Sequence, residues 1–598
     1  MCGINGIYAY AGAPADRDEL RTTRDFMAAR GPDGLGEWTG EGGRVAFGHR
    51  RLSIVDLTEG GAQPMRSADG RITVTFNGEI YNFPELRREL EARGCVFQSR
   101  SDTEALLHLY RLHGVDMLPR LRGMFAFGLW DADKQSLLLA RDPYGIKPLY
   151  YADDGETVRF ASSVKALIAG GQVSRAPDPA GLAGYHLFGS VPEPWTCHKA
   201  IKSLPAGGYV KANARGLETP RRYFSLSQTY VEAERATSPV DVVASFRASA
   251  LDSVRHHLMA DVPVGAFLSA GVDSGALLGL MRDAGQDVIQ TVTLGFEAFR
   301  GTPQDESPLA AEIARQYGAA HTIRWVGETE FRDDLPKILA AMDQPSIDGI
   351  NTWFVSKATR ELGLKVAISG VGGDELLGGY STFARLPKLL RALRWLPNLP
   401  RSAPLGGAVV DFSRRLGLPL HPKSAGLLAY GHDYAGAYLL QRGVYLPSDL
   451  REAMGDPEFA AAGLRELQPL AMLGGALTPE PREAFSKVAV LESSLYLRNQ
   501  LLRDSDWAGM AHSIEIRTPL VDSELLTRVA PLFARPAPPN GKSLLAQAPT
   551  TPLPAKIVDR PKTGFGVPLR KWFDDGKMSK DDRLWSRDWL KRVAASAG

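Results

Sequence analysis

The alternation of short apolar runs with polar turn residues dominates residues 1–210. Runs of β-type composition lie at residues 71–76, 124–130 and 136–140, and glycine, aspartate and asparagine separate them. Helix-like segments stand between these runs, for example residues 84–94. This mixture predicts sheets that are covered by helices, an α+β arrangement for this part of the chain.

The pattern changes at about residue 211 and again at about residue 241. Residues 211–240 are polar with little apolar periodicity, which predicts a linker. Beyond them, helix-like segments alternate with apolar strands, and this alternation predicts a parallel, doubly wound α/β sheet. Residues 385–480 contain many prolines and short helical segments and indicate little else. The apolar strands expected after residue 241 lie at residues 262–269, 288–296, 321–326 and 365–370.

Composition and charge narrow the function. The 598 residues suffice for more than one domain of about 100–200 residues. The formal net charge of +2 gives no strong field for nucleic acid or an anionic membrane, so neither is expected as a partner. Three cysteines are too few for a disulfide framework, which favours a reducing, cytoplasmic compartment. No basic segment precedes the first apolar residues, and no run of about 18 apolar residues predicts a membrane span.

Cys2 is the first residue with candidate chemistry. Removal of the initiator methionine would leave Cys2 with a free α-amine beside its thiol. An α-amine has a pKa of about 8 and can act as a general base at neutral pH. One residue would thus supply both nucleophile and base. A cysteine at position 2 is incidental in most proteins, so other segments of the sequence must show whether Cys2 is a nucleophile.

Five segments together carry a resemblance that Cys2 alone does not. The chain begins with MCGINGI, and four more segments follow: RLSIVDL from Arg51, FNGEIYN from Phe76, SRSDTE from Ser99 and ARDPYGIKPLYY from Ala140. In order and spacing they resemble the glutaminase domain of glutamine-hydrolysing asparagine synthetases, which are class II glutamine amidotransferases. The resemblance implies that residues 1–210 fold as an N-terminal nucleophile αββα sandwich in which Cys2 attacks glutamine.

The resemblance also implies a glutamine pocket. Arg51 would bind the α-carboxylate of glutamine, a task that suits the planar guanidinium. Glu79 and Asp102 would accept hydrogen bonds from the α-ammonium group. The Asn77 side-chain amide and the Gly78 N–H would stabilise the oxyanion that forms on the way to the thioester.

A strand, a small-residue loop and a helix are expected at residues 267–278, FLSAGVDSGALL. Backbone N–H groups at the start of such a helix can bind phosphate. The loop Ser269–Ser274 resembles the pyrophosphate loop of ATP pyrophosphatases. It is not a Walker A loop, because no Gly-Lys-Ser/Thr follows. Residues 369–380, SGVGGDELLGGY, resemble the second nucleotide loop of the asparagine synthetases.

These two loops imply an ATP pyrophosphatase domain over residues 241–598, with ATP and Mg²⁺ as cofactors. Asp273 and Asp374 match the two positions that bind Mg²⁺ in relatives, and hard oxygen ligands suit this ion. Lys562, in the matching segment KTGFGVPL, corresponds to a lysine that stabilises the phosphates during acyl adenylation. The resemblance implies ATP contacts from Leu268, Ser269, Gly271, Asp273, Ser274, Leu294, Ser369 and Gly370.

The resemblance implies a reaction at two sites. Glutamine is hydrolysed at Cys2 through a thioester, and ammonia passes through an internal channel to the second domain. There ATP adenylates the carboxylate of an acceptor such as aspartate, and ammonia then displaces AMP to give an amide. The expected partners are therefore the small-molecule substrates glutamine, ATP and a carboxylic acid. Relatives are often dimers, so a homodimer is expected.

Four residues depart from the pattern of the family. Val371 replaces an acidic residue that relatives use for the aspartyl-adenylate, and it can neither form a side-chain hydrogen bond nor carry charge. The acceptor therefore stays open between aspartate and another carboxylic acid of a specialised biosynthetic pathway. The other departures are Gly373 for a serine, Ala270 for the first glycine of the pyrophosphate loop, and Ser163 for a glutamate.

Two further alternatives come from other classes. One is a cyclase resembling β-lactam synthetase, which uses an internal amine, but such relatives typically lack the N-terminal cysteine. The other is a non-catalytic scaffold, which the joint retention of both sets of site residues argues against. Loss of glutaminase activity in Cys2→Ala would separate an enzyme from a scaffold. Neither charge nor motifs indicate binding to nucleic acid.

Overall fold

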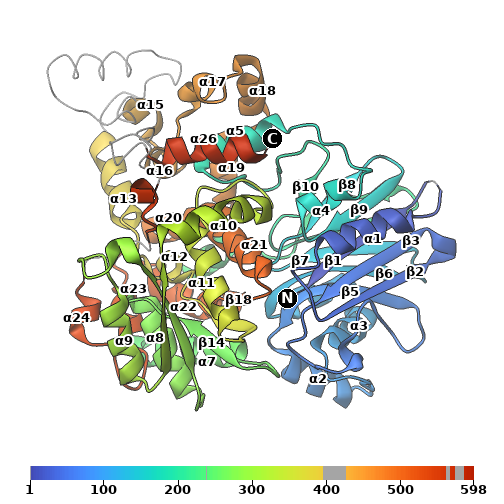
Figure 1. Ribbon diagram of the computed structural model, residues 1–598, viewed down its shortest axis with the longest axis horizontal. Helices are drawn as coiled ribbons and strands as arrows, with labels where there is room; N and C mark the ends of the chain where they lie inside the picture. Colours follow the sequence, from blue (N-terminus) through green and yellow to red (C-terminus); the bar gives the residue numbers. More distant parts are fainter. Residues whose placement is uncertain are drawn as a thin grey trace.

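Two antiparallel sheets are stacked in the first part of the chain (Figure 1). The computed structural model describes residues 2–11, 13–237, 239–394, 426–560, 566–572 and 585–597. The strands of the first sheet, in spatial order, are β10 (Lys202–Ser203), β8 (Tyr150–Asp153), β9 (Thr157–Ala161), β1 (Gly3–Ala9), β3 (Val45–Arg51) and β2 (Gly34–Gly40). Those of the second are β12 (Gly216–Leu217), β11 (Gly208–Asn213), β7 (Ser136–Arg141), β6 (Gly123–Asp131), β5 (Ile72–Ile80) and β4 (Met65–Arg66), with β13 (Arg221–Arg222) also paired to β11.

One apolar layer joins the two sheets. Phe160 on β9 is wholly buried in it, against Gly6 of β1 and Gly128 of β6. A Cβ added at either glycine would overlap the Phe160 ring, so these glycines make room for it. Tyr8 and Trp130 add an aromatic contact across the layer, with ring centroids 5.0 Å apart.

Helices cover both outer faces of this pair of sheets. Leu20 of α1 packs on Ile7 of the first sheet, and Leu106 of α3 belongs to the apolar cluster on the second sheet. Asp16 begins α1 because its carboxylate accepts hydrogen bonds from two N–H groups of the first turn. The predicted αββα sandwich is therefore confirmed. The covering helices are α1 (Arg17–Phe26) and α4 (Val164–Ala169) on the first sheet, and α2 (Phe83–Ala92) and α3 (Asp102–His113) on the second.

Residues 211–240 differ from the linker that their composition predicts. β11 extends to Asn213 and pairs with β7, and β12 and β13 pair with β11. The helix α6 (Leu226–Ala233) then buries Leu226 and Tyr230 in the core of the second domain. β11 lies between β7 on one side and β12 and β13 on the other, and these partners make it a strand despite its polar composition.

A parallel sheet forms the centre of the second part of the chain. Its strands, in spatial order, are β16 (Ala320–Val326), β15 (Gln290–Phe296), β14 (Val264–Phe267), β17 (Val366–Ile368) and β18 (Glu515–Arg517). The chain fills this order outward from β14, first to one side and then to the other. The loops after β14 and β17 therefore meet at the carboxyl edge, where doubly wound sheets bind ligands.

Helices lie on both faces of this sheet, so the predicted doubly wound fold is confirmed (Figure 1). One face carries α7 (Val242–His257), α8 (Val272–Asp283), α9 (Ser307–Gln316), α22 (Ser523–Phe533) and α23 (Gly541–Gln547). The other carries α10 (Glu328–Ala341), α11 (Ile350–Glu361) and α21 (Arg503–Ala511).

Shorter helices cover the carboxyl edge of the sheet (Figure 1). A π-helix of 11 residues, η7 (Glu492–Leu502), runs between α20 and α21 without a break. Within the described residues, no helix is long and apolar enough to cross a membrane. The remaining helices are α5 (Pro179–Phe188), α12 (Gly373–Leu377), α13 (Thr382–Leu393), α15 (Leu427–Tyr430), α16 (Tyr434–Arg442), α17 (Leu450–Ala453), α18 (Pro457–Leu467), α19 (Pro469–Ala476), α20 (Ala484–Leu491), α24 (Ala555–Val558), α25 (Leu569–Trp572) and α26 (Trp585–Ala597).

We expect Gly128→Ala to destabilise the sandwich by about 1–3 kcal/mol, because the methyl group would have to displace the buried Phe160 ring. Gly474→Ala is the matched control, because a Cβ on this helical glycine meets no atom within 4 Å. The control should be neutral or stabilising by about 0.5–1 kcal/mol. Thermal unfolding of both variants measures the difference, and equal melting temperatures would contradict the packing described here.

Candidate functional site

Cys2 lies buried directly before β1, which is an inner strand of the first sheet. Its backbone N–H donates to Asn77 Oδ1 at 2.9 Å, and Arg30 Nε donates to its carbonyl at 3.2 Å. Burial raises the pKa of the Cys2 thiol. A thiol in this position is protonated at neutral pH, so attack on a carbonyl needs a base beside it.

The Asn77 amide has a free donor next to this cysteine. The side chain is wholly buried on β5, and within the described part of the chain its Nδ2 has no hydrogen-bond partner. A buried, unpaired N–H group is costly, and such groups persist mainly where a ligand or intermediate pairs with them. Gly78 follows with φ 151°, and a Cβ there would overlap the Met124 carbonyl, so this position requires glycine.

A short loop holds Arg51 at the end of β3. Its Nη1 donates to the Thr58 carbonyl at 2.9 Å, and its Nη2 donates to the Asp56 carbonyl. Gly61 makes room for the guanidinium, because a Cβ there would overlap Nη2. The guanidinium is thus fixed in direction while the side chain stays half-exposed, as binding a carboxylate requires.

Glu79 and Asp102 bring two carboxyl groups to the same part of the sandwich. Asp102 stands in the first turn of α3, and its Oδ2 accepts from the Ile80 N–H at 2.8 Å. Burial raises the pKa of Asp102 to about 6. Burial also raises the pKa of Glu79 well above its ordinary range, and the negative charges of Glu515 and Asp102 add to this. A cationic group between these carboxyls would favour their ionised forms.

Two charged residues of β18 join this pocket from the second domain. Arg517 is wholly buried; its Nε donates to Glu515 Oε1 at 2.6 Å, and its Nη2 lies 3.7 Å from Glu79 Oε1. Its Nη1 donates to the carbonyls of His257 and Met259 at 2.8 and 2.6 Å. Neither residue is singled out by the sequence motifs described above, and only the docking of the domains brings them to Glu79.

The first nucleotide loop is a tight turn between β14 and α8. Ser274 Oγ lies 3.0 Å from Ser269 Oγ and accepts from the Ser269 N–H at 3.1 Å. Ala270 is buried and has no positive φ, so alanine is accommodated here without backbone strain.

The second nucleotide loop follows β17 and lies directly against the first. A Cβ at Gly370 would lie 3.0 Å from Asp273 Cβ, and one at Gly373 would lie 2.6 Å from Asp273 Cγ. Gly372 has φ 94° and fits closely against Val521. Glycines at these positions therefore let the two loops approach each other.

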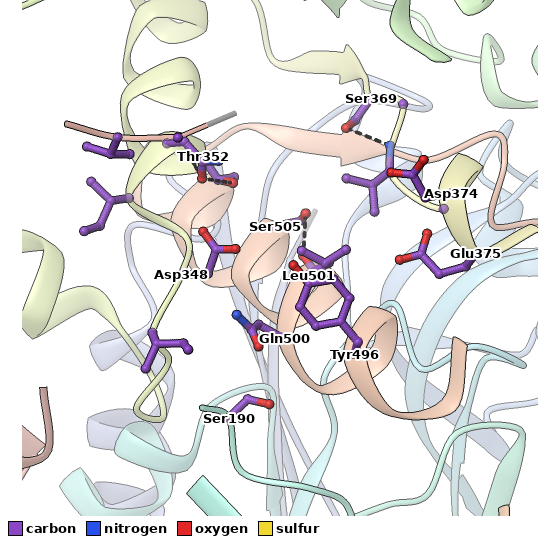
Figure 2. Close-up of a pocket in the computed structure, with 18 of the residues that line it drawn as sticks. Ser190, Asp348, Thr352, Ser369, Asp374, Glu375, Tyr496, Gln500, Leu501 and Ser505 are labelled. Carbon is purple, nitrogen blue, oxygen red and sulfur yellow. Dashed lines mark hydrogen bonds between the residues drawn. The ribbon is translucent and has the colours of Figure 1, made fainter. Parts of the chain in front are cut away.

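Both loops line one cavity of about 760 Å³. Figure 2 shows Ser369 and Asp374 of the second loop at its wall. Val371 also lines it, and its N–H lies 3.4 Å from Ser369 Oγ. Glu375 is buried nearby, and its pKa rises to about 7 because of burial and the charge of Asp374. The structure brings together here every residue predicted to contact ATP or metal within the described ranges: Leu268, Ser269, Gly271, Asp273, Ser274, Leu294, Ser369, Gly370 and Asp374.

Lys542 of α23 lies between the two predicted metal ligands, although no sequence motif marks it. Its Nζ is 2.5 Å from Asp273 Oδ1 and 2.7 Å from Asp374 Oδ1. Burial disfavours its charge, but the two carboxylates outweigh burial and raise the pKa of Lys542. Among the described residues, no group of three or more His, Cys, Asp or Glu side chains could hold a metal ion. Lys562, the predicted phosphate-stabilising lysine, lies outside the described residues.

Known families match both halves of the chain. A model described as a glutamine amidotransferase domain matches residues 1–224, and one described as asparagine synthase matches residues 245–592. The chain belongs to the asparagine synthase family. "Asparagine synthetase [glutamine-hydrolyzing] 1" of Bacillus subtilis is 32% identical, over 100% of this chain and 91% of that protein. A putative asparagine synthetase of Mycobacterium bovis is 33% identical, over 97% of this chain and 89% of that protein.

This membership confirms an enzyme rather than a scaffold. The chain is an ATP-dependent carbon–nitrogen ligase that takes its nitrogen from glutamine. Its glutamine amidotransferase half is the stacked pair of sheets around Cys2, and its asparagine synthase half is built on the parallel sheet.

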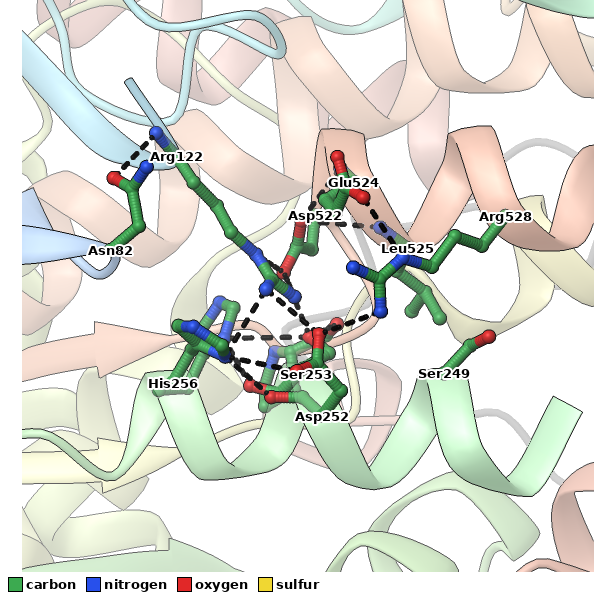
Figure 3. Close-up of polar contacts among 12 residues, drawn as sticks. Asn82, Arg122, Ser249, Asp252, Ser253, His256, Asp522, Glu524, Leu525 and Arg528 are labelled. Carbon is green, nitrogen blue, oxygen red and sulfur yellow. Dashed lines mark hydrogen bonds and ion pairs between the residues drawn. The ribbon is translucent and has the colours of Figure 1, made fainter. Parts of the chain in front are cut away.

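The two halves of this asparagine synthase family member are also joined by a buried ion cluster around Arg122 (Figure 3). Arg122 Nε donates to Asp522 Oδ2 at 2.8 Å, and its Nη1 donates to Asp252 Oδ2 at 2.8 Å. His256 Nδ1 lies 3.1 Å from the same Nη1. The Arg122 N–H donates to Asn82 Oδ1, and Asn82 follows the strand that carries the predicted glutamine-binding residues.

Asp522 carries this contact to the nucleotide loops. It begins α22 by accepting from the N–H groups of Glu524 and Leu525 (Figure 3). The two residues before it, Leu520 and Val521, pack against the turn at Gly372 and Gly373. A path of hydrogen bonds, backbone and packing contacts therefore runs from β5 through Arg122 and Asp522 to the second nucleotide loop.

Ser163, the departure without a sequence explanation, belongs to another contact between the domains. Its Oγ donates to Asp343 Oδ1 at 2.6 Å, and the N–H groups of Val164 and Lys165 donate to the same carboxylate at 3.1 Å each. Ser163 also caps α4 by accepting from the Ala166 N–H. A small hydroxyl here leaves the start of α4 free to bind the aspartate of the second domain.

We expect kcat/KM for glutamine hydrolysis to fall with decreasing pH below about 6, as Asp102 becomes protonated. Protonated Asp102 could no longer pair with the α-ammonium of glutamine, and kcat/KM reports groups of the free enzyme. A pH profile of glutaminase activity from pH 5 to 8 measures this step, and Asp102→Asn should lower affinity and remove it. An unchanged inflection in the variant would assign the step to another group.

We expect Arg122→Gln to lower stability by about 3–5 kcal/mol, because it leaves the buried Asp522 carboxylate without its cation. It should also raise the number of glutamines hydrolysed per amide formed, because the path between the sites is cut. Arg528→Gln is the control; its more exposed pairs with Glu524 and Asp252 contribute at most about 1 kcal/mol. Thermal unfolding and product stoichiometry test both, and tight coupling in a folded Arg122→Gln protein would contradict the second expectation.

Proposed function

We propose that this protein makes asparagine from aspartate, with glutamine as the nitrogen donor and ATP as the activating substrate. The observation that carries the proposal is similarity over nearly the full length to two proteins named asparagine synthetases. The cavity lined by both nucleotide loops supports it, since it can hold a nucleotide and a small acid together.

In the first half, the thiol of Cys2 attacks the amide carbon of glutamine. The freed α-amine of Cys2 takes the thiol proton and passes it to the departing ammonia. Asn77 Nδ2 and the Gly78 N–H stabilise the oxyanion, and water then hydrolyses the thioester to glutamate. Arg51 binds the α-carboxylate of the substrate, and Glu79 and Asp102 bind its α-ammonium.

In the second half, the side-chain carboxylate of aspartate attacks the α-phosphorus of ATP and pyrophosphate leaves. Ammonia then attacks the acyl carbon of the adenylate, and AMP leaves with the bonding electron pair. Leu268 and Leu294 hold the adenine through their backbone. The phosphates are bound by Ser269, Gly271, Ser274, Ser369 and Gly370.

Asp273 and Asp374 would hold Mg²⁺. The fit is supported by Lys542, whose ammonium shows that both carboxylates can meet at one cation. Together with phosphate oxygens they would form the all-oxygen shell that Mg²⁺ prefers. When bound, Mg²⁺ supplies positive charge that offsets the charge on the departing pyrophosphate. Lys562 is proposed to stabilise the same phosphates, by its match to the family motif.

Ammonia must reach the second half without protonation by bulk water. The buried contact of Glu79 with Arg517 and Glu515 supports an enclosed route between the halves. The domain limits near residues 211–240, the homodimer and the cytoplasmic location stay predictions.

A different acceptor acid is not favoured, because the full-length relatives carry the name asparagine synthetase. Val371 nevertheless lines the cavity, where it offers neither charge nor a side-chain hydrogen bond to an acceptor. An internal-amine cyclase is also not favoured, because the chain keeps Cys2 and the free Asn77 donor.

Isotope transfer tests the proposal. With glutamine labelled by ¹⁵N in its amide, aspartate and ATP, we expect ¹⁵N-asparagine, glutamate, AMP and pyrophosphate in equal amounts. Cys2→Ala should lose this reaction but still make asparagine from an ammonium salt, because the second half is intact. If pyrophosphate were released with another carboxylic acid of a panel but not with aspartate, that acid would be assigned as the acceptor in place of aspartate.

A further inference from the structure

One wall of the nucleotide cavity is formed by the π-helix η7. Gln500 lies on this helix, is 4% exposed, and points into the cavity (Figure 2). Among the residues that the structure describes, its side-chain amide has no hydrogen-bond partner. Its two N–H donors and its carbonyl oxygen are therefore available to a ligand in the cavity. π-helical turns also occur frequently at functional sites.

Asp348 faces the same cavity from the turn before α11 (Figure 2). Its Oδ1 accepts from the Gly349 N–H at 2.9 Å, and no cation of the described ranges pairs with it. The other carboxylates of the cavity are paired: Asp273 and Asp374 with Lys542, and Glu375 with the Tyr380 hydroxyl at 2.9 Å. Asp348 is therefore the cavity carboxylate whose partner is missing from the described chain.

A second carboxylate stands behind Asp348. Asp504 accepts from Ser346 Oγ and from Trp507 Nε1, each at 2.8 Å, and it does not line the cavity. Burial, and next the negative charge of Asp348, raise the pKa of Asp504 to about 7. Two acidic groups at one wall favour a cationic ligand over a neutral or anionic one.

The two arginines that line the cavity are held by other partners. Arg442 pairs with the buried Glu492 at 2.9 Å, and its guanidinium lies between the rings of Tyr380 and Tyr496 at 4.4 and 4.0 Å. Arg587 donates to the Val444 carbonyl and lies over the Tyr445 ring. Among the described residues that line the cavity, no arginine is therefore free to pair with Asp348, and a cationic ligand would supply the missing charge.

We propose that Asp348 binds the α-ammonium and Gln500 the α-carboxylate of an amino-acid acceptor. An α-amino acid carries a strong donor and a strong acceptor on one carbon, and this wall offers the complementary pair. The proposal rests on the proposed function, in that aspartate would be the acceptor. The side-chain carboxylate of the acceptor is then left to reach the nucleotide loops.

Such a wall selects an amino acid over a plain carboxylic acid. Succinate has the carbon chain of aspartate without the amine, and its binding would leave Asp348 buried and unpaired. Sites built to pair a polar group reject analogues that lack it by large factors, up to about 10⁴–10⁵. The same argument excludes acceptors that present only hydroxyl groups beside their carboxylate.

Steady-state kinetics with an ammonium salt and ATP test the proposal, because they bypass the glutamine site. Asp348→Asn should raise KM for aspartate about 100-fold and change kcat a few-fold at most. It should also lower the ratio of kcat/KM for aspartate to kcat/KM for succinate. Gln500→Leu should also raise KM for aspartate. KM for ATP and glutaminase activity should stay unchanged in both variants. Asp333→Asn removes an exposed carboxylate far from the cavity lining and is the matched control.

The outcomes separate this proposal from the proposed function. If the wild-type protein uses aspartate but Asp348→Asn changes its KM less than twofold, the subsite is overturned. If wild-type protein uses another acceptor, aspartate fails as the substrate. An acceptor with an α-amine and a raised KM in Asp348→Asn would still support the subsite, whereas an acceptor without an amine would overturn it. If Asp348→Asn misfolds and loses glutaminase activity, Gln500→Leu tests the subsite instead. A change of less than twofold in its KM for aspartate would overturn the proposal.

Discussion

The guanidinium of Arg517 is buried from water at the meeting of the two domains. Removing such a charge from water costs many kcal/mol unless partners surround it. Glu515 and two carbonyls at the end of α7 supply most of these partners, and Glu79 of the glutamine pocket faces the remaining side. Glu79 is the residue of the first domain that meets this set, so the predicted glutamine pocket borders the interface between the domains.

Close backbone approach is the corresponding constraint on the nucleotide side. The strand order reverses between β14 and β17, so two loops leave neighbouring strands at one edge. Gly370 and Gly373 then let the second loop approach Asp273 of the first. As a result, two aspartates from segments about a hundred residues apart in the chain share the ammonium of Lys542.

The sequence predicts those parts of the site whose residues lie in contiguous motifs. Both sheet architectures, the cysteine and the two loops follow from local pattern and resemblance, because each motif forms one strand with its loop. Lys542 and Gln500 were missed, since a lone lysine or glutamine on a helix carries no signal until tertiary packing aims it at a cavity. The strand pairing of Lys211 and Ala212 was missed for a similar reason, because β7 supplies their partners from over 70 residues away.

The helix from Ala484 to Ala511 is continuous through α20, η7 and α21, and it touches both halves of the reaction. Gln500 stands on it in the wall of the cavity, and Asp506, six residues later, accepts two hydrogen bonds from Arg30 at 2.7 and 3.0 Å. Arg30 in turn donates to the carbonyl of Cys2. The six residues from Gln500 to Asp506 span on the order of 10 Å of helix between the cavity wall and the contact to Cys2. Because α20, η7 and α21 form one unbroken helix, the position of Gln500 in the cavity wall and the position of the Cys2 backbone are fixed relative to each other.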